Sequence, residues 1–266
     1  MSTSIALRLS PPLRYILRIA DTCLIHAQRL GEWCGHGPVL EEDIALTNMA
    51  LDLIGVTRSL YTHAALLEGQ GFDEDQLAFL RDEDDFLNLT LVEQPMRKPS
   101  AHSPGGDFAD TVLRNFLLAT WLKAVWSGVS KSKDSQLAAI AAKALKESRY
   151  HQQHAGDWVV RLGDGTDESA ARMQAALERA WPYTGEMFQR DEIDRAAEAS
   201  GLGPARDTLR EAWRAEVLEV LSEAHLPAPA DSPFVATGTR GRHSEHMGFI
   251  LAEMQVLQRT HPGGRW

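Results

Sequence analysis

The sequence contains few of the features that mark membrane, nucleic-acid-binding or disulfide-stapled proteins. Its 266 residues include only two cysteines, Cys23 and Cys34, and their spacing fits neither a disulfide framework nor a CxxC zinc site. It contains no apolar run of the roughly 18 residues that a transmembrane helix needs. At a formal net charge of −10, it lacks a basic face that could neutralise a run of phosphates. We therefore expect a cytoplasmic protein without membrane or nucleic-acid partners.

Strand and hairpin signals are almost absent, whereas apolar residues recur at helical spacing along most of the chain. Four long helices are predicted, over residues 11–34, 39–68, 107–130 and 134–163. Further helices are predicted over residues 167–180, 183–199, 206–225 and 243–259. The stretch 91–106 carries three prolines and no period, which predicts a long loop. The pattern indicates one all-α domain over residues 1–266, with a four-helix core over about 11–163 and additional helices over about 166–260.

The third long helix is the most apolar of the four. Its side chains include Phe116, Trp121 and Trp126, which predicts that it is buried on most sides. The same apolar surface also suits a docking face for a partner protein. The sequence leaves both interpretations open.

A metal site is suggested by the stretch 141–158. Glu147, His151 and His154 follow one another at i, i+4 and i+7, so they project from one side of the predicted helix. Carboxylates and imidazoles on shared helix faces build the di-iron sites of four-helix bundles, usually as Glu-x-x-His. In this chain the third residue after Glu147 is Tyr150, and the histidine comes one position later.

The second long helix shows a similar defect. Asp52 and Gly55 have the i, i+3 spacing of a ligand pair, but glycine has no side chain with which to ligate. The first helix offers Asp21, and the third carries no acid between Asp110 and Ser130. A complete site needs about six ligands from four helices.

The ligand inventory is therefore incomplete, and we predict no metal in this chain. We interpret five positions as degenerate di-iron positions: Asp52, Gly55, Glu147, Tyr150 and His151. Such a chain is expected to replace metal with ion pairs, here among Asp52, Glu147 and His151, with Arg58 or Arg149 as further partners. The alternative hypothesis is an independent di-metal oxidoreductase that uses Asp52, Glu147 and His151.

One further motif could bind an anion. Residues 237–243 form a basic, glycine-containing loop that carries Arg240 and Arg242 and leads into a predicted helix. A helix N-terminus beside two arginines suits a phosphate. An ordinary surface loop explains the same residues.

A family resemblance rests on motifs distributed over nearly the whole chain. They are QRLGEWCGH (28–36), LTNMALDLIG (46–55), RDEDDFLN (81–88), LVEQP (91–95), DFADT (107–111), KESRYH (146–151), LGDGTD (162–167), HSEH (243–246) and LAEMQ (251–255). In this order they resemble the C subunit of the ring-1,2-phenylacetyl-CoA epoxidases of aerobic bacterial phenylacetate breakdown. The stretch 96–105 is longer than that family usually has.

The resemblance implies a ferritin-like helical fold and a structural, non-catalytic role. In that family a separate A subunit holds the di-iron centre and epoxidises the ring of phenylacetyl-CoA, while a small B subunit and a reductase complete the system. The resemblance thus implies a hetero-oligomer with no catalytic residue and no cofactor in this chain. A separate hypothesis is that Arg240 and Arg242 contact the coenzyme A phosphates of the substrate at the interface with the partner subunit.

Overall fold

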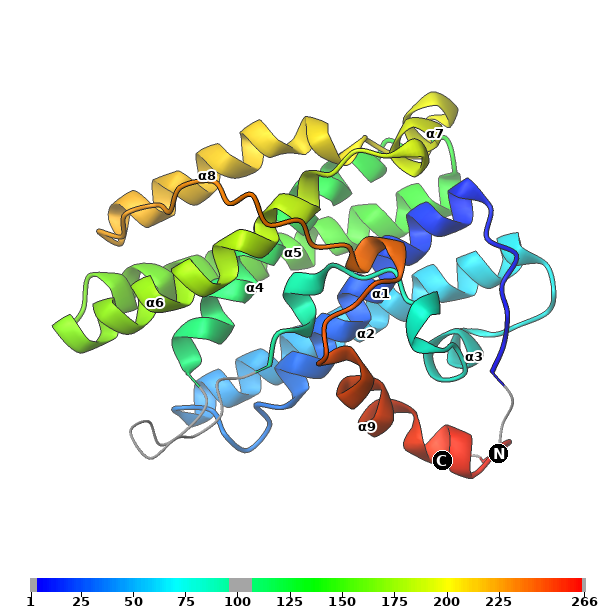
Figure 1. The fold of residues 1–266 in the computed structure, drawn as a ribbon, viewed down its shortest axis with the longest axis horizontal. Coiled ribbons are helices and arrows are strands. Elements are labelled where there is room, and N and C mark those ends of the chain that lie inside the picture. The colour runs from blue at the N-terminus through cyan, green and yellow to red at the C-terminus, as the bar shows by residue number, and fades with distance from the viewer. Residues whose placement is uncertain (1–3, 96–106, 265–266) are drawn as a thin grey trace. The chain divides into compact units, whose positions relative to one another are not determined.

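The computed structural model describes residues 4–95 and 107–264, and the predicted all-α class is confirmed for them (Figure 1). They contain no strand, and Thr237 and Arg242 form an isolated β-bridge. The long stretch 96–105 lies outside the described residues. The α-helices are α1 (Pro11–Gly31), α2 (Leu40–Glu68), α3 (Glu74–Phe79), α4 (Phe108–Val129), α5 (Ser135–Gly163), α6 (Asp167–Thr184), α7 (Glu192–Ser200), α8 (Arg210–Glu223) and α9 (Met247–Thr260). Short 3₁₀ helices are η1 (Glu83–Asp85), η2 (Thr90–Glu93), η3 (Gly185–Phe188), η4 (Arg206–Leu209) and η5 (Gly238–Arg240).

The described residues form two compact units. The first contains residues 4–94 and 237–264, so the C-terminal segment with α9 returns to the N-terminal helices. The second contains residue 95 and residues 107–236. The division of one domain into a core over 11–163 and later additions stays a prediction.

In the first unit, α1 and α2 pack against each other along their length (Figure 1). Pro11 and Pro12 occupy the first positions of α1, where a missing N–H costs no helical hydrogen bond. Helix α2 begins with Glu41, Glu42 and Asp43, which complement the positive end of the helix dipole. It ends at Gly69, whose φ of 80° is the left-handed conformation of a helix cap. These local signals explain why both predicted helices form close to their expected bounds.

In the second unit, α4 is the buried centre. It packs against α5, α6 and α8, and its side chains are buried on nearly every side. Two indole nitrogens donate to backbone carbonyls within this core: Trp121 Nε1 to Met187 O at 3.2 Å and Trp213 Nε1 to Leu117 O at 3.0 Å. The predicted burial of this helix is confirmed. Its use as a docking face is wrong, because the chain's own helices cover the apolar side chains.

The predicted helix over residues 183–199 is also wrong. Helix α6 runs on to Thr184, and the chain leaves the helical conformation before α7 begins at Glu192. The cause is Asp191, whose extended backbone (φ −138°) lets its carboxylate accept the amides of Ile193 and Asp194. This is the geometry of an N-cap, which starts a new helix.

The last helix begins at Met247 and not at His243. Residues 243 and 244 are held by other groups of the first unit, described below, so the helical hydrogen-bond pattern starts only after them. None of the helices in residues 4–95 and 107–264 combines the length and the hydrophobicity of a transmembrane segment.

Candidate functional site

The five degenerate di-iron positions are divided between the two units. Asp52 and Gly55 lie on α2 of the first unit, where Asp52 is half-buried and Gly55 is exposed. An added Cβ at Gly55 would meet no atom within 4 Å, so the glycine faces open space. Arg58, a suggested replacement partner, pairs with Glu74 through an Nε–Oε1 distance of 3.0 Å.

The other three positions lie on α5 of the second unit. His151 is buried, Glu147 is partly exposed and lies 3.5 Å from Lys143, and Tyr150 is 54% exposed. The Tyr150 ring lies edge-on to that of His151 and tilted against that of His154, with centroid distances of 6.2 and 6.1 Å. The loss of ligands at these positions stays a prediction. Across residues 4–95 and 107–264, no three His, Cys, Asp or Glu side chains are grouped so that they could hold a metal ion.

Asp21, the acid that the first helix offers, is part of a fully buried ion pair. Arg81 Nη2 and Nη1 donate to its two carboxylate oxygens at 2.6 and 3.0 Å, and neither side chain is exposed. Tyr61 donates to Oδ1 at 2.6 Å, and the Leu87 amide donates to Oδ2 at 2.8 Å. Four donors therefore satisfy the four lone-pair sites of this carboxylate.

Arg81 is satisfied as completely as its partner. Its remaining donors reach the Leu77 carbonyl at 2.6 Å, the Asp85 carbonyl at 3.1 Å and the Tyr61 hydroxyl oxygen at 2.7 Å, and its guanidinium lies 4.1 Å from the Phe86 ring centroid. Burial alone would lower the pKa of Arg81, but the charge of Asp21 raises it. Burial also raises the pKa of Cys23, beside Asp21. A buried charge pair with every polar atom bonded is a structural centre, because changing any one member leaves a charge unpaired.

A second buried cluster ties the C-terminal segment to the rest of the first unit. His243 Nδ1 lies 2.7 Å from Glu93 Oε1, and His243 Nε2 lies 2.9 Å from the carbonyl of Phe86. Glu93 also accepts from Asn88 Nδ2 at 2.9 Å and from the Ser244 amide at 2.7 Å. A carboxylate and a carbonyl both accept hydrogen bonds, so both ring nitrogens carry protons and His243 is an imidazolium.

The electrostatics agree with this assignment. Burial alone would lower the pKa of His243, but the hydrogen bond and the charge of Glu93 raise it above the usual range. The side chains of His243 and Glu93 are both fully buried. The imidazolium therefore closes an ion pair between η2 and the segment before α9.

Arg240 and Arg242 are both exposed on the turn around Gly241, whose φ is 76°. Helix α9 begins at Met247, farther along the chain than the predicted start at His243, so the loop does not lead directly into a helix N-terminus. The contact of these arginines with coenzyme A stays a prediction.

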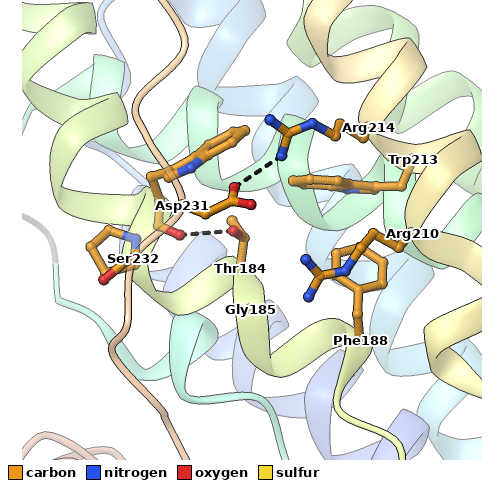
Figure 2. Close-up of a pocket in the computed structure, with 10 residues that line it drawn as sticks. Thr184, Gly185, Phe188, Arg210, Trp213, Arg214, Asp231 and Ser232 are labelled. Carbon is orange, nitrogen blue, oxygen red and sulfur yellow. Dashed lines mark hydrogen bonds and ion pairs between the residues drawn. The ribbon is translucent and has the colours of Figure 1, made fainter.

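A small cavity of about 60 Å³ lies in the second unit (Figure 2). Three aromatic rings form its walls: Trp181 and Trp213 have centroids 5.9 Å apart, and Phe188 lies 5.1 Å from Trp213. Small-molecule sites usually enclose about 300–1,000 Å³. This cavity is therefore too small to enclose an acyl-coenzyme A substrate.

Charged side chains reach the same cavity from α8 and from the segment that follows it. Arg214 Nη1 lies 3.0 Å from Asp231 Oδ1, and the Arg210 guanidinium lies 5.3 Å from the Phe188 ring centroid (Figure 2). The Arg214–Asp231 pair links the extended chain after α8 to that helix, and because both side chains are exposed it contributes little stability.

The sequence interpretation missed Arg81, Glu93 and His243 as organising residues. All three belong to motifs that carry the family resemblance, RDEDDFLN, LVEQP and HSEH. The motifs alone did not indicate what these residues contact. Only their spatial meeting shows what they do, because Arg81 is 60 positions from Asp21 and His243 is 150 positions from Glu93.

The comparisons with known proteins agree with the motifs. The family described as phenylacetic acid catabolic protein matches residues 2–266 of the chain. The C subunit of 1,2-phenylacetyl-CoA epoxidase from Escherichia coli (strain K12) is 48% identical over 252 residues, which cover 95% of this chain and 98% of that protein. The predicted resemblance to the C subunit is thereby confirmed. The chain belongs to the phenylacetic acid catabolic protein family, a ferritin-like helical family of phenylacetate catabolism.

Proposed function

We propose that this chain is the structural, non-catalytic C subunit of a phenylacetyl-CoA epoxidase and that it stabilises the catalytic A subunit. The saturated Asp21 carboxylate is the observation that carries the proposal. Arg81, Tyr61 and the Leu87 amide occupy all of its lone-pair sites, so a guanidinium takes the place that a cation would need. A buried pair of this kind holds a helical scaffold in one arrangement without supplying chemistry.

The proposal assigns the chemistry to the partner. The di-iron centre belongs to the A subunit, this chain carries no cofactor, and a small B subunit and a reductase complete a cytoplasmic hetero-oligomer. The family membership and the high identity to the C subunit of an epoxidase over almost the full length support this assignment. The alternative, an independent di-metal oxidoreductase that uses Asp52, Glu147 and His151, requires stoichiometric metal in the purified chain, which elemental analysis tests.

Co-expression tests the proposal. The catalytic subunit is produced with and without this chain, and its yield, its co-elution with the chain and the epoxidation of phenylacetyl-CoA are measured. We expect a co-eluting complex, and a loss of soluble catalytic subunit when the chain is omitted. Arg81→Met in this chain should reduce the yield of the complex, whereas Arg172→Ala, which removes an exposed ion pair with Glu168, is the matched control.

The proposal fails if the two proteins elute separately and epoxidation proceeds equally well without this chain.

A further inference from the structure

The C-terminal segment, residues 237–264, is held on the first unit by packing and not by its neighbours in the chain. The residues that precede it belong to the second unit. Over positions 227–235 they form no helix or strand, and all but Pro229 are exposed. The C-terminal segment can therefore leave the first unit without unfolding any other helix of that unit.

The first residues of the C-terminal segment make close backbone contacts. Arg18 Nε donates to the carbonyl of Thr239 at 3.0 Å, and the Gly238 amide donates to Thr90 Oγ1 at 3.1 Å. The backbone at Gly238 lies so near the Asn88 carbonyl that an added Cβ would be 2.4 Å from its oxygen. Amide, hydroxyl and guanidinium groups do not titrate near neutrality, so these contacts do not depend on pH between about 6 and 9.

His243 makes the contact that does depend on pH. Its Nδ1 lies 2.7 Å from Glu93 Oε1 and its Nε2 lies 2.9 Å from the Phe86 carbonyl oxygen, and the side chains of His243 and Glu93 are fully buried. Only an imidazolium donates to both oxygens. When its proton leaves, one ring nitrogen turns a lone pair toward an acceptor, and the buried carboxylate loses its opposite charge. Each change is unfavourable away from water.

The charged groups around His243 are of types that keep their charge, with one exception. Besides Arg18, they come from α1, η1, η2 and the C-terminal segment itself: Arg29, Glu83, Glu93, Arg242, Glu245 and His246. Of these types, only histidine ordinarily changes its charge between about pH 6 and 9. His246 lies 3.9 Å from Glu245 and its side chain is 30% exposed, so water screens its charge. The proton on His243 therefore decides this contact.

Helix α9 depends on the contact because its own apolar packing is limited. Of its 14 residues, Met247, Ile250, Leu251 and Gln255 are buried, whereas the large side chain of Phe249 is 72% exposed. A short helix is marginal without tertiary packing. Once the residues before it are no longer fixed, α9 has little to hold it on the first unit.

We propose that the C-terminal segment is a pH-dependent latch, closed on the first unit while His243 is an imidazolium and open when its ring is neutral. It opens as one cooperative unit that includes α9, while α1 and α2 stay folded. Burial alone would lower the pKa of His243, but Glu93 raises it above its usual range. The latch therefore opens on the alkaline side of that range. It is a property of the chain itself and does not depend on the proposed function.

Hydrogen exchange of the full chain tests the latch. It is followed by mass spectrometry from about pH 6 to 9.5 and corrected for the intrinsic exchange rate. Peptides from α9 should keep a constant protection factor at low pH. Above the midpoint of opening, their protection should fall by up to about tenfold per pH unit, as the loss of one proton requires. Peptides from α2 are the internal reference and should keep their protection.

Three variants identify the group responsible. His243→Gln carries no charge at any pH, so α9 should show low protection throughout, without dependence on pH. Glu93→Gln removes the charge that holds the proton, so the midpoint of opening should fall by about one pH unit or more. His246→Gln, at a partly exposed histidine of the same segment, is the matched control and should leave the wild-type profile unchanged. Circular dichroism shows whether each variant is folded.

Four outcomes overturn the proposal. They are α9 protection that is independent of pH in the wild type, a loss of protection that includes α2, a midpoint that Glu93→Gln leaves in place, and a His243→Gln variant with the wild-type profile. If His243→Gln does not fold, the wild-type profile and the midpoint of Glu93→Gln decide.

Discussion

The Asp21 carboxylate and the Arg81 guanidinium share two hydrogen bonds, of 2.6 and 3.0 Å, with neither side chain exposed to solvent. The pair joins α1 to the segment after α3, sixty residues later in the chain. Removing one partner of a buried ion pair leaves the other charged and unsatisfied, which costs more than the pair contributes. It is one of the fully buried ion pairs of the first unit, as is the pair between Glu93 and His243.

Arg81→Met should lower the free energy of unfolding by about 3–5 kcal/mol, because Asp21 would lose two donors in a buried site. Arg58→Ala, which breaks an exposed pair with Glu74, should cost at most about 1 kcal/mol. Urea unfolding followed by circular dichroism measures both. Adding Asp21→Leu to Arg81→Met should recover part of the loss, and an Arg81→Met variant as stable as Arg58→Ala would contradict the assigned role.

The stability contributed by His243 should depend on pH. Its pKa is raised in the folded state, so its contribution is complete below the unfolded pKa of about 6.5 and is lost as pH rises through the folded pKa. The difference in unfolding free energy between the wild type and His243→Gln, measured from pH 5.5 to 9, should be largest at low pH, about 1.5–3 kcal/mol, and shrink as pH rises. The exposed His36→Gln serves as control, and a difference that grows with pH would contradict the imidazolium.

The same substitution at two glycines should have opposite effects. Gly55→Ala should raise the free energy of unfolding by about 0.5–1 kcal/mol, because the position is exposed inside a helix and the added methyl meets nothing. Gly163→Ala should lower it by about 1–3 kcal/mol. Its Cβ would lie 2.4 Å from the carbonyl oxygen of Ala224. Thermal and urea unfolding distinguish the two, and equal effects would show that the surroundings of these glycines are misassigned.

The purified chain should contain no stoichiometric iron or manganese. Elemental analysis of the wild type and of Glu147→Ala should give the same background. The unfolding free energy should fall by at most about 0.5 kcal/mol through loss of the exposed pair with Lys143. One equivalent of metal that disappears in Glu147→Ala would instead support the di-metal oxidoreductase.

The double variant Arg240→Ala with Arg242→Ala tests the coenzyme A contact in the assembled complex. If the two exposed arginines bind the substrate's phosphates, the KM for phenylacetyl-CoA should rise about tenfold while kcat changes little. Arg172→Ala, on the exposed face of α6, is the control. An unchanged KM would contradict the hypothesis that these arginines contact coenzyme A.

Local signals in the sequence were sufficient for most of the fold. The prolines at 11 and 12 and the acids at 41–43 mark helix starts that the structure reproduces, because they act within one turn. The same holds for Asp134, which precedes α5 and whose carboxylate accepts a hydrogen bond from the Leu137 amide. The prediction of one continuous helix over residues 183–199 failed because a local signal was overlooked. A single cap at Asp191 overrides a helical pattern that continues through it.

What the sequence by itself determined is therefore the helical class, most helix starts and, through its motifs, the family. Only the tertiary structure decided which charged residues meet. Asp21 pairs with Arg81, 60 residues away in the sequence, and Glu93 pairs with His243, 150 residues away. The physical reason is that burial of a charge is tolerated only beside a partner, and that partner is chosen by the packing of helices rather than by spacing along the chain.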